Sequence, residues 1–582
     1  MANMKLVEAL KLAKAASNRG GEPLSFFLAA GFNPLHLSTF LGAELSLLFV
    51  GRKIEIQRGL YGDLLGNIAR LANADAEAGV VLLEWCDFDA RLGVRSSAAC
   101  GPAVCNDIIE TANARASEIR SRLKDTAARM PTALSFPTLP VLPLSFSPGW
   151  QASSFEVELD SIVQSLRKDI SQAGQVRILS SRRLDLLSPL KERWDIEADL
   201  LSGFPYTISH ASSMAALLAQ LVRRPEPKKG LITDLDDTLW RGIVGEVGVE
   251  GISWHLDYHS QMHAFYQRLL GALSAEGVLL GIASKNDPAV VEAALRRKDL
   301  ALTASAFFPI EVSWGPKSEA VSRILKNWNI GADSVVFIDD SPLELAEVKA
   351  SHPDVECIQF AAKDGAAIYD IAMRLRDLFG RAAVHNEDTI RAQSIRRSRA
   401  LADEFEAAKS TSEGFLQQIQ AEIGLNFDKS PLDPRALELI NKTNQFNLNG
   451  KRFTEARWQN YFRDDSSFLL VASYTDKFGP LGKIAVIAGY HHAKTLDIEA
   501  WVMSCRAFSR RIEYQCLEEL FTKFDVDEIR LDFAMTDRNG PLREFLQNVL
   551  GKPPEPGCTI SRQLFGSRPG LVKEPHGVGT NG

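Results

Sequence analysis

A short apolar run that ends in a cluster of acids constrains this chain more than any other segment. Residues 230–238 read Gly-Leu-Ile-Thr-Asp-Leu-Asp-Asp-Thr, and the charged, proline-containing stretch 223–230 leads into them. Such a stretch is typical of a linker, and a short apolar run directly after it is typical of a buried strand. We therefore predict a strand at Gly230–Asp234 with two carboxylates, Asp234 and Asp236, at its carboxyl end.

The residues after this strand alternate strand-like and helix-like runs. Further strands are predicted at Val278–Ala283, Ala306–Ile310, Ser334–Ile338 and Val355–Gln359. Helices between successive strands imply a parallel sheet with crossover connections, and ligands of such sheets bind beyond the carboxyl ends of the strands. Residues 228–380 are thus predicted to form one α/β domain with its site at that edge.

Four of the acids at the predicted carboxyl ends of two strands are candidate site residues: Asp234, Asp236, Asp339 and Asp340. A carboxylate at a strand tip, such as Asp234, is able to attack phosphorus. A second acid two residues further on, Asp236, is placed to protonate a leaving group and then to activate water. Carboxylates crowded at one edge need a hard divalent cation to offset their repulsion. The acids together predict phosphoryl transfer with Mg²⁺ as cofactor.

The other polar residues at this edge suit the oxygens of a phosphate. Ser284, Lys285 and Asn286 follow the second strand with hydroxyl and N–H donors, and Lys317 adds a positive charge. With Thr238, they form the predicted substrate-binding set. The alternative is an acidic strand exit that merely solvates the sheet edge, and four motifs in this order argue against it.

The spacing of these residues leaves little room for an inserted domain. Only 45 residues separate Thr238 from Ser284, and 32 separate Ser284 from Lys317. After the helices and strands that the sheet requires, neither interval holds a sizeable cap. The site is thus predicted to be open, which admits a large substrate such as a protein-tethered group.

The order Asp-x-Asp-x-Thr, Ser, Lys, Asp-Asp resembles the four motifs of the haloacid dehalogenase (HAD) superfamily. The resemblance implies that Asp234 is the nucleophile and Asp236 the general acid/base. It also implies that Ser284 and Lys317 bind phosphate and that Glu344 helps to order the last loop. The implied magnesium ligands are Asp234, the backbone of Asp236, Asp339 and Asp340.

A closer resemblance, to the FkbH-like proteins, extends over most of the chain. The segments that carry it are 236–246, 284–287, 314–318, 337–340 and 441–448. Some members of this family remove the phosphate from a phosphoglyceryl group and load glyceryl onto an acyl carrier protein in polyketide and related secondary metabolism. The resemblance implies a phosphatase or phosphotransferase whose partner is an acyl carrier protein or a phosphorylated small metabolite.

The resemblance also implies three domains in an α/β fold, with the capless HAD-type parallel sheet in the middle. Residues 1–222 resemble an SGNH hydrolase domain, and residues 386–550 resemble a GNAT acetyltransferase domain of α+β order. Residues 551–582 are rich in Gly, Pro and Ser and are predicted to form a mobile tail.

Residue patterns predict several elements in the two flanking domains. In the first domain these are strands at Leu24–Ala30, Val80–Glu84 and Val176–Leu179, helices at Cys105–Met130 and Ala211–Val222, and a surface segment at Thr132–Pro148. Ser209 or Ser212 is the predicted cap of the second helix. In the last domain they are helices at Arg399–Ile423 and Arg511–Phe524 and strands at Ser467–Ser473, Lys483–Gly489, Leu496–Met503 and Glu528–Phe533.

Each domain departs from its family's pattern. No cysteine lies in the four motifs, and Cys357, the nearest, is predicted to be a core residue. The segment Leu28–Asn33 lacks the serine of an SGNH esterase, and His210 has Thr207 rather than an acid three residues before it. His210 is thus predicted to be a surface or capping histidine, and residues 1–222 a degenerate docking module.

In the GNAT-like region, Ser509 and Arg511 replace the glycines expected in Arg506–Arg511, where a cofactor pyrophosphate would approach the backbone. Two alternatives to a phosphoryl-transfer enzyme therefore stay open. One is a non-catalytic scaffold that docks a carrier protein. The other is an acyl-CoA-dependent acetyltransferase that uses the C-terminal domain.

Three histidines, His255, His259 and His263, are spaced to share one face of a helix. A zinc site would need further ligands, so we interpret them as structural or substrate-rim residues. Neighbouring aromatic residues predict a flap beside the active site. They are Trp254, Tyr258, Phe265 and Tyr266.

Composition excludes several classes of function. A net charge of −7 argues against nucleic acid or an anionic membrane as the main partner. The seven scattered cysteines do not describe a disulfide framework, and residues 1–23 lack the apolar core of a signal peptide. We expect a cytoplasmic protein.

Overall fold

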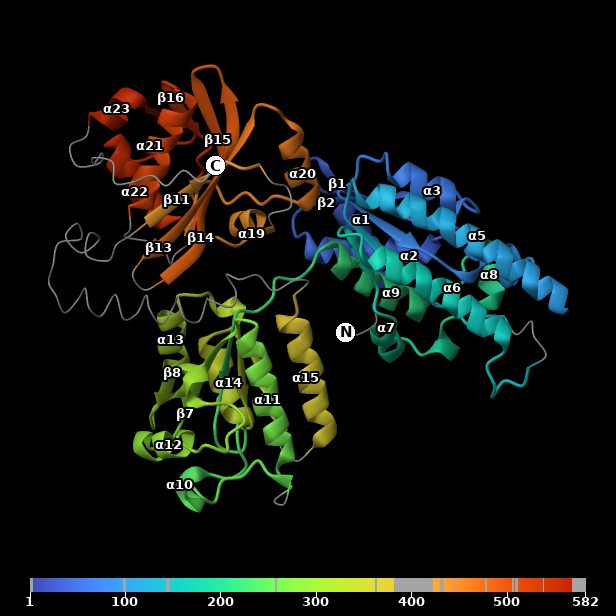
Figure 1. Ribbon diagram of the computed structural model, residues 1–582, viewed down its shortest axis with the longest axis horizontal. Coiled ribbons are helices and arrows are strands. Elements are labelled where there is room, and N and C mark those ends of the chain that lie inside the picture. The colour runs from blue at the N-terminus through green and yellow to red at the C-terminus, as the bar shows by residue number, and fades with distance from the viewer. Residues whose placement is uncertain are drawn as a thin grey trace. The chain divides into compact units, whose positions relative to one another are not determined.

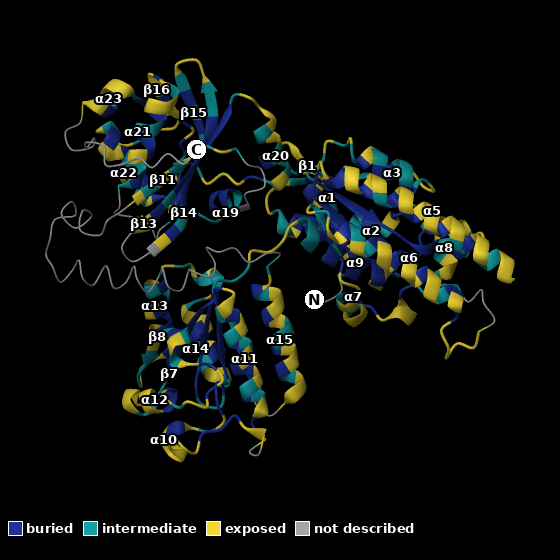
Figure 2. Cartoon of the chain, viewed as in Figure 1, coloured by how far each residue is buried: buried dark blue, intermediate teal, exposed yellow. Residues whose placement is uncertain are grey.

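The computed structural model describes residues 4–97, 101–142, 147–256, 259–361, 364–381, 422–429, 434–443, 445–476, 479–504, 507, 511–536 and 539–567. The chain divides into two compact units, residues 1–225 with 454–461 and residues 226–453 with 462–582. The described residues form three sheets, one in the first unit and two in the second (Figure 1). Figure 2 shows the strands buried and the outer faces of the helices exposed. Within the described part of the chain, no helix is both long and apolar enough to cross a membrane.

The N-terminal sheet has five parallel strands in the order β2-β1-β3-β4-β5. They are β1 (Pro23–Ala30), β2 (Lys53–Arg58), β3 (Ala78–Leu82), β4 (Thr132–Ser135) and β5 (Val176–Ile178). Alternate residues of β1 enter different cores: Phe26 and Leu28 pack on one face, Phe27 and Ala29 on the other. Both faces are covered by helices, as an all-parallel sheet requires.

The helices of this domain divide between the two faces. The first core includes residues of α1 (Leu6–Ser17), α2 (Leu35–Leu48) and α9 (Ile208–Val222), and the second includes residues of α3 (Leu64–Leu71), α5 (Pro102–Ala127) and α6 (Ser154–Ser171). Two predictions were wrong here. The segment 132–148 was expected at the surface, but its first four residues form the buried strand β4. Thr207, not Ser209 or Ser212, caps α9 by accepting a hydrogen bond from the His210 N–H.

The middle sheet is also five-stranded and parallel, in the order β10-β9-β6-β7-β8. Its strands confirm the sequence prediction to within two residues: β6 (Gly230–Thr233), β7 (Leu279–Ser284), β8 (Phe307–Val312), β9 (Val335–Asp339) and β10 (Glu356–Gln359). The acid-bearing strand β6 lies at the centre, between β9 and β7. The residues that follow these three strands therefore lie at one edge of the sheet.

Two layers of helices enclose this sheet. One core includes residues of α11 (Gln261–Ala275), α12 (Pro288–Leu295) and α15 (Gly365–Phe379), and the other includes residues of α13 (Lys317–Trp328) and α14 (Pro342–Ser351). The Trp328 ring packs so closely on the sheet that a Cβ on Gly230 would lie 2.4 Å from it, and one on Gly281 would lie 3.0 Å from it. These two glycines allow α13, which carries Lys317, to approach the strands.

The connection from β6 to β7 contains no inserted domain among its described residues. It consists of a bridge between Arg241 and Ser253, the short helix α10 (Val244–Val247) and then α11. The loop is fastened at its base, because the Arg297 guanidinium donates to the Val249 and Ile252 carbonyls. The predicted absence of a large cap agrees with this arrangement.

The C-terminal sheet is mixed, in the order β11-β13-β14-β15-β16-β17, with β12 paired to β15. Its strands are β11 (Glu422–Asn426), β12 (Phe446–Asn447), β13 (Ser467–Asp476), β14 (Gly479–His492), β15 (Thr495–Met503), β16 (Glu528–Leu531) and β17 (Thr559–Ser561). Only β15 and β16 pair in parallel. The helices are α19 (Pro434–Lys442), α21 (Ile512–Phe524), α22 (Gly540–Leu550) and α23 (Arg562–Gly566). The helix α20 (Glu455–Arg463) falls mostly in the first compact unit.

The predicted mobile tail is partly wrong. Ile560 on β17 and Phe565 on α23 are buried in the C-terminal core, so the domain continues to residue 567; residues 568–582 lie outside the described residues. The predicted helix Arg399–Ile423 also lies outside them up to residue 421, and its last two residues belong to β11.

The segment 441–448, singled out in the sequence, has a structural role. β15 pairs with β16 only over Thr495–Ile498. Beyond that point β12 takes the same edge, opposite Val502 and Met503, and the Leu448 N–H donates to the Trp501 carbonyl at 2.9 Å. Asparagine side chains in and beside this segment form hydrogen bonds that supplement the few backbone hydrogen bonds of the two-residue strand β12.

Asn539 fastens this segment from the other side. Its fully buried side chain donates to the Asn447 and Ala534 carbonyls and accepts from the Thr536 N–H. Asn539→Ala would leave one buried and two partly buried polar groups unpaired, so we expect the free energy of unfolding of this domain to fall by about 2–3 kcal/mol. Denaturant titration measures the change. Gln547→Ala, at an exposed position on α22, is the matched control; equal effects of the two substitutions would contradict this account.

Candidate active site

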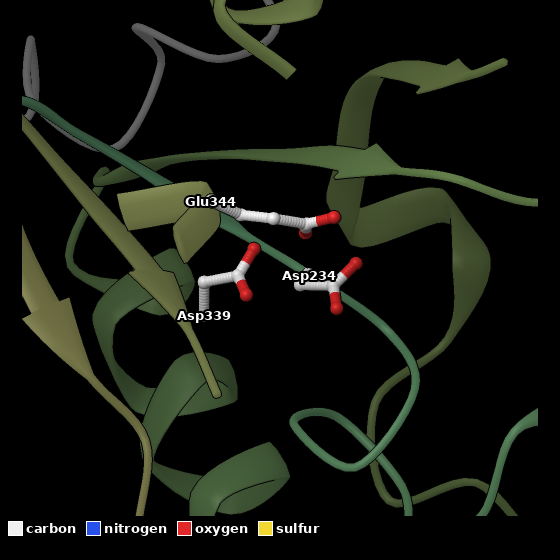
Figure 3. Close-up of side chains that lie close together, drawn as sticks. All are labelled: Asp234, Asp339 and Glu344. Carbon is white, nitrogen blue, oxygen red and sulfur yellow. The ribbon is translucent and has the colours of Figure 1, made fainter. Parts of the chain in front are cut away.

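Three carboxylates meet at the carboxyl edge of the middle sheet. Asp234 directly follows β6 and Asp339 ends β9, and the strand register places Thr233 beside Ile338. Glu344 reaches the same place from the first turn of α14. Ligand oxygens of the three side chains all lie within 4.8 Å of one another, and Figure 3 shows them facing a common point.

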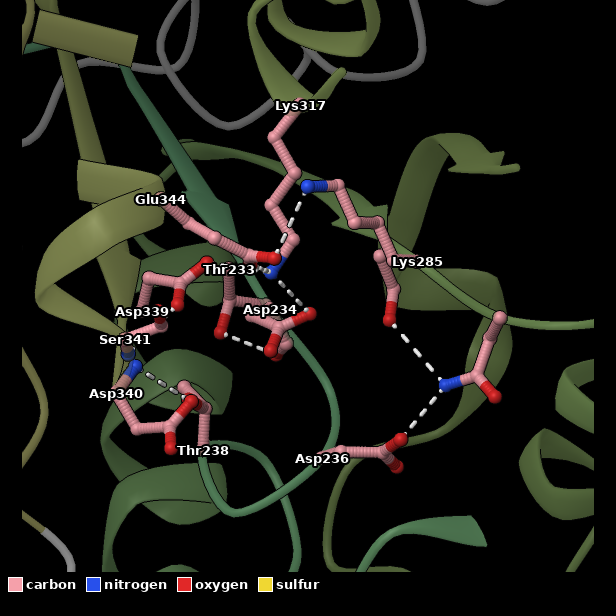
Figure 4. Close-up of polar contacts among 12 residues, drawn as sticks. Thr233, Asp234, Asp236, Thr238, Lys285, Lys317, Asp339, Asp340, Ser341 and Glu344 are labelled. Carbon is pink, nitrogen blue, oxygen red and sulfur yellow. Dashed lines mark hydrogen bonds and ion pairs between the residues drawn. The ribbon is translucent and has the colours of Figure 1, made fainter. Parts of the chain in front are cut away.

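Lys317 supplies the positive charge in this cluster. It is the first residue of α13, and its side chain is only 3% exposed. Its Nζ lies 3.0 Å from Asp234 Oδ1 and 2.5 Å from Asp339 Oδ2, and it also contacts Glu344 Oε2 (Figure 4). A buried lysine is tolerated here because the carboxylates surround it.

The pKa values reflect this crowding. Burial raises the pKa of Asp234 to about 7 against the opposing charge of Lys317, and repulsion from Asp339 adds to the rise. Burial also raises the pKa of Asp339 to about 6. Burial disfavours the charged form of Lys317, but Asp234 and Asp339 outweigh it and raise the pKa of that lysine. One lysine thus compensates these acids only in part.

The donor set fits a hard divalent cation. Asp234 Oδ1 is buried and accepts no hydrogen bond, although Lys317 lies beside it. Carboxylate oxygens are the ligands that Mg²⁺ prefers, and a cation would offset the remaining repulsion. Of the predicted metal ligands, the structure brings Asp234 and Asp339 together and adds Glu344, which sequence analysis had assigned only to ordering a loop.

Asp236 lies apart from the three carboxylates, further along the loop after β6 (Figure 4). Its Oδ1 accepts from Trp240 Nε1 at 2.9 Å and from the Val244 N–H at 3.1 Å, and its Oδ2 accepts from Asn286 Nδ2 at 2.8 Å. These donors fix the orientation of the carboxylate. In this arrangement its side chain contributes to the loop beside the cluster rather than to the cluster itself.

Thr238 connects the loops that follow β6 and β9. Its hydroxyl accepts from the Asp340 N–H at 3.1 Å, and its carbonyl lies 2.9 Å from His263 Nδ1. The Asp340 side chain is half-buried, and burial raises its pKa. Thr238 is itself fully buried. The structure therefore gives Thr238 contacts within the protein, where sequence analysis predicted contacts with substrate.

The remaining predicted phosphate-binding residues follow β7. Ser284 ends that strand, and its hydroxyl lies 3.5 Å from Asn286 Nδ2. Lys285 Nζ lies 3.2 Å from Glu344 Oε1 and 3.7 Å from Glu347 Oε2. The three residues thus border the carboxylate cluster, and two of them contact its acids or Asp236.

The predicted face of three histidines does not form. Helix α11 begins only at Gln261, and His259 has a positive φ of 51°. His255 pairs with Asp299, while His263 contacts the Thr238 carbonyl. The predicted aromatic flap is also wrong: Trp254 and Tyr266 are buried core residues, and Phe265 alone is exposed. Tyr258 lies outside the described residues.

His210 was predicted to be a surface or capping residue, and this was wrong. It is fully buried, with Nδ1 2.9 Å from Ser188 Oγ and Nε2 3.1 Å from Thr138 Oγ1. The Thr138 hydroxyl in turn donates to Glu84, which also accepts from the Tyr206 hydroxyl, each at 2.6 Å. Burial lowers the pKa of His210 to about 3, so the ring is neutral at pH 7. Ser188 is enclosed as well, and this chain of contacts is part of the core.

The carboxyl group of Asp87, which lies beside Glu84, makes the N-terminal domain sensitive to pH. It accepts from the Glu84 N–H at 2.8 Å, and burial raises its pKa to about 7. A folded-state pKa above the unfolded value near 4 means that stability is lost as the pH rises between these values. Asp87→Asn should therefore stabilise the domain at pH 8 relative to wild type but not at pH 4.

Denaturant titrations at several pH values measure this difference. Asp125→Asn, at an exposed position on α5, is the matched control. A stability difference between Asp87→Asn and wild type that does not change with pH would contradict the assignment.

Two other predicted features lie away from the carboxylate cluster. Cys357, on β10, packs against the core that includes residues of α13 and α14, and burial raises the pKa of its thiol. In the C-terminal domain, residues 505, 506 and 508–510 lie outside the described residues, and Arg511 precedes α21 with a φ of 58°.

Comparisons with known proteins give a match of fold. No protein-family model matches the chain, and no curated protein matches it. Among solved structures, it is similar to the N-terminal part of the protein BF1531 from Bacteroides fragilis, whose crystal structure contains a phosphatase domain complexed with Mg. The identity is 18% and the TM-score 0.51, and the match covers 64% of this chain and 99% of that one. The matched share exceeds residues 226–381, so the likeness extends beyond the middle sheet.

Proposed function

We propose that the middle domain is a Mg²⁺-dependent phosphatase or phosphotransferase with Asp234 as its nucleophile. The observation that carries the proposal is the buried group of Asp234, Asp339 and Lys317 at the carboxyl edge of a parallel sheet. The sequence resemblance to HAD enzymes and the phosphatase domain of the structurally similar BF1531 fragment support it.

The chain's own residues account for both halves of such a reaction. An Asp234 oxygen attacks phosphorus as the bond from phosphorus to the leaving oxygen breaks, and protonated Asp236 gives its proton to that oxygen. Water then attacks the aspartyl-phosphate, Asp236 takes one of the water's protons, and inorganic phosphate leaves with Asp234 restored. Lys317 and Lys285 offset the charge of the phosphoryl oxygens.

Mg²⁺ would be held by Asp234 and Asp339, and when bound it would neutralise charge on the phosphoryl oxygens. Thr238 and His263 keep the loop after β6 in position beside the loop after β9. Asn286 orients Asp236 from the loop after β7. Three loops thus contribute to the site, although only Asp234 forms a covalent bond to phosphorus.

The proposed substrate is a phosphoglyceryl group destined for an acyl carrier protein. The support is the sequence resemblance to FkbH-like proteins and the absence of an inserted domain between β6 and β7 among the described residues. Transfer through a thioester would need a thiol, and the four motifs contain no cysteine. The proposal for this chain is therefore the phosphoryl half of that reaction, with glyceryl loading left to a thiol from another source.

Asp234→Asn tests the nucleophile. With Mg²⁺ present, wild type should release phosphate from members of a panel of phosphoesters and acyl phosphates that includes 1,3-bisphosphoglycerate. Asp234→Asn should reduce kcat by about a thousandfold or more, because the amide is not a nucleophile. A chelator should abolish wild-type turnover, and Mg²⁺ should restore it. Equal turnover by wild type and Asp234→Asn would refute the proposal.

Asn286→Ala tests whether Asp236 must be held in place. We expect kcat to fall about tenfold with little change in KM, since general acid/base catalysis depends on orientation. In the double variant, Asn286→Ala should lower kcat hardly further than Asp236→Asn does alone, because both substitutions act on one group. The control is Asp287→Asn, which preserves the cap of α12 and does not contact Asp236. Additive losses in the double variant would count against this role.

A further inference from the structure

Glu344 is shared by the two lysines of the site. Its Oε2 contacts Lys317 Nζ, and its Oε1 lies 3.2 Å from Lys285 Nζ. Its side chain is 18% exposed, whereas those of Asp234 and Asp339 are 7% and 0% exposed. Figure 4 shows the Glu344 side chain reaching the ends of both lysine side chains.

Carboxylates surround the ammonium group of Lys317. An ammonium group has three N–H donors, and Lys317 already faces three carboxylates, those of Asp234, Asp339 and Glu344. A phosphoryl oxygen that approaches Lys317 therefore competes with these carboxylates. Asp234 and Asp339 are short side chains fixed by the strand ends, while Glu344 has a longer, partly exposed side chain on a helix. Glu344 is the carboxylate that is able to leave.

We propose that Glu344 is a positioning residue that holds Lys317 and Lys285 toward the site and is displaced from them by the phosphate of the substrate. This inference rests on the proposed phosphoryl-transfer function and assigns a specific competition to that site. In the absence of substrate the carboxylate balances the lysine charges. When phosphate binds, the lysines exchange one anionic partner for another without moving far.

The same position allows a different role, because Glu344 is one of the three carboxylates able to share a cation. The two roles have opposite consequences for Glu344→Gln. If Glu344 competes with phosphate for the lysines, the variant should bind inorganic phosphate more tightly and require the same Mg²⁺ concentration. If Glu344 is a metal ligand, the variant should require much more Mg²⁺ and gain no phosphate affinity.

The experiment is isothermal titration of inorganic phosphate and, separately, of Mg²⁺ into the full chain, with kcat and KM measured on the same preparations. For Glu344→Gln we expect phosphate to bind about tenfold more tightly, product inhibition to strengthen equally, and the dissociation constant of Mg²⁺ to stay within twofold of wild type. Glu344→Asp, which keeps the charge but is too short to contact both lysines, should fall between wild type and Glu344→Gln.

Glu347→Gln is the matched control. Glu347 lies one turn further along α14, contacts Lys285 at 3.7 Å and accepts from the Ser318 N–H, and has no contact with Lys317. Its phosphate affinity should match that of wild type. Phosphate affinity that is unchanged or weaker in Glu344→Gln, or a Mg²⁺ dissociation constant raised tenfold, would overturn the inference. Failure of the proposed function is a separate result, in which wild type binds neither phosphate nor Mg²⁺ and turns over no substrate.

Discussion

Lys317 is buried among carboxylates at the edge of the middle sheet, and the rest of the candidate site depends on this arrangement. A buried ammonium group is stable only when anions face it, and a buried pair of aspartates needs a cation in turn. Asp234 and Asp339 come from adjacent strands and Lys317 from the start of a helix. Three separate elements must therefore pack correctly before any of these charges is compensated. The close approach of α13 over Gly230 and Gly281 makes that packing possible.

Lys317 compensates the negative charge of the carboxylates only in part, and this has a consequence for the chemistry of the site. With the pKa of Asp234 raised to about 7 and that of Asp339 to about 6, the cluster attracts further positive charge at neutral pH. The site is preorganised for a divalent ion and an anionic group that arrive together. The supporting hydrogen bonds to Asp236 and Thr238 come from neighbouring loops, so the loops after β6, β7 and β9 act as one unit.

Features that depend on residues close together in the sequence were predicted correctly. The strands of the middle sheet are continuous apolar runs because both faces are buried, and their ends carry the acids, so this sheet and its polar edge were predictable. Predictions were wrong for features that depend on contacts between residues far apart in the sequence. β4 is too short to be recognised from the sequence. The buried His210 has its ring partners, Thr138 and Ser188, far away in the sequence. Ile560 and Phe565 enter a core built from residues much earlier in the chain. The sequence did not indicate the contacts of Glu344, because the two lysines that it contacts lie far from it in the sequence. The family identity of the flanking domains remains a prediction.

The two residues of β12 have a consequence for how the chain can be divided. An open sheet edge is a template for pairing with a second molecule, and Phe446 and Asn447 cover the stretch of β15 that β16 does not reach. A fragment that began at β13 would keep the longest strands yet expose backbone donors and acceptors at Val502 and Met503, and it would also lose β11 from the edge of β13. Self-association of such a fragment would follow from the loss of these two edge partners. Hydrogen-bond partners, rather than strand length, thus define the smallest self-contained form of this domain.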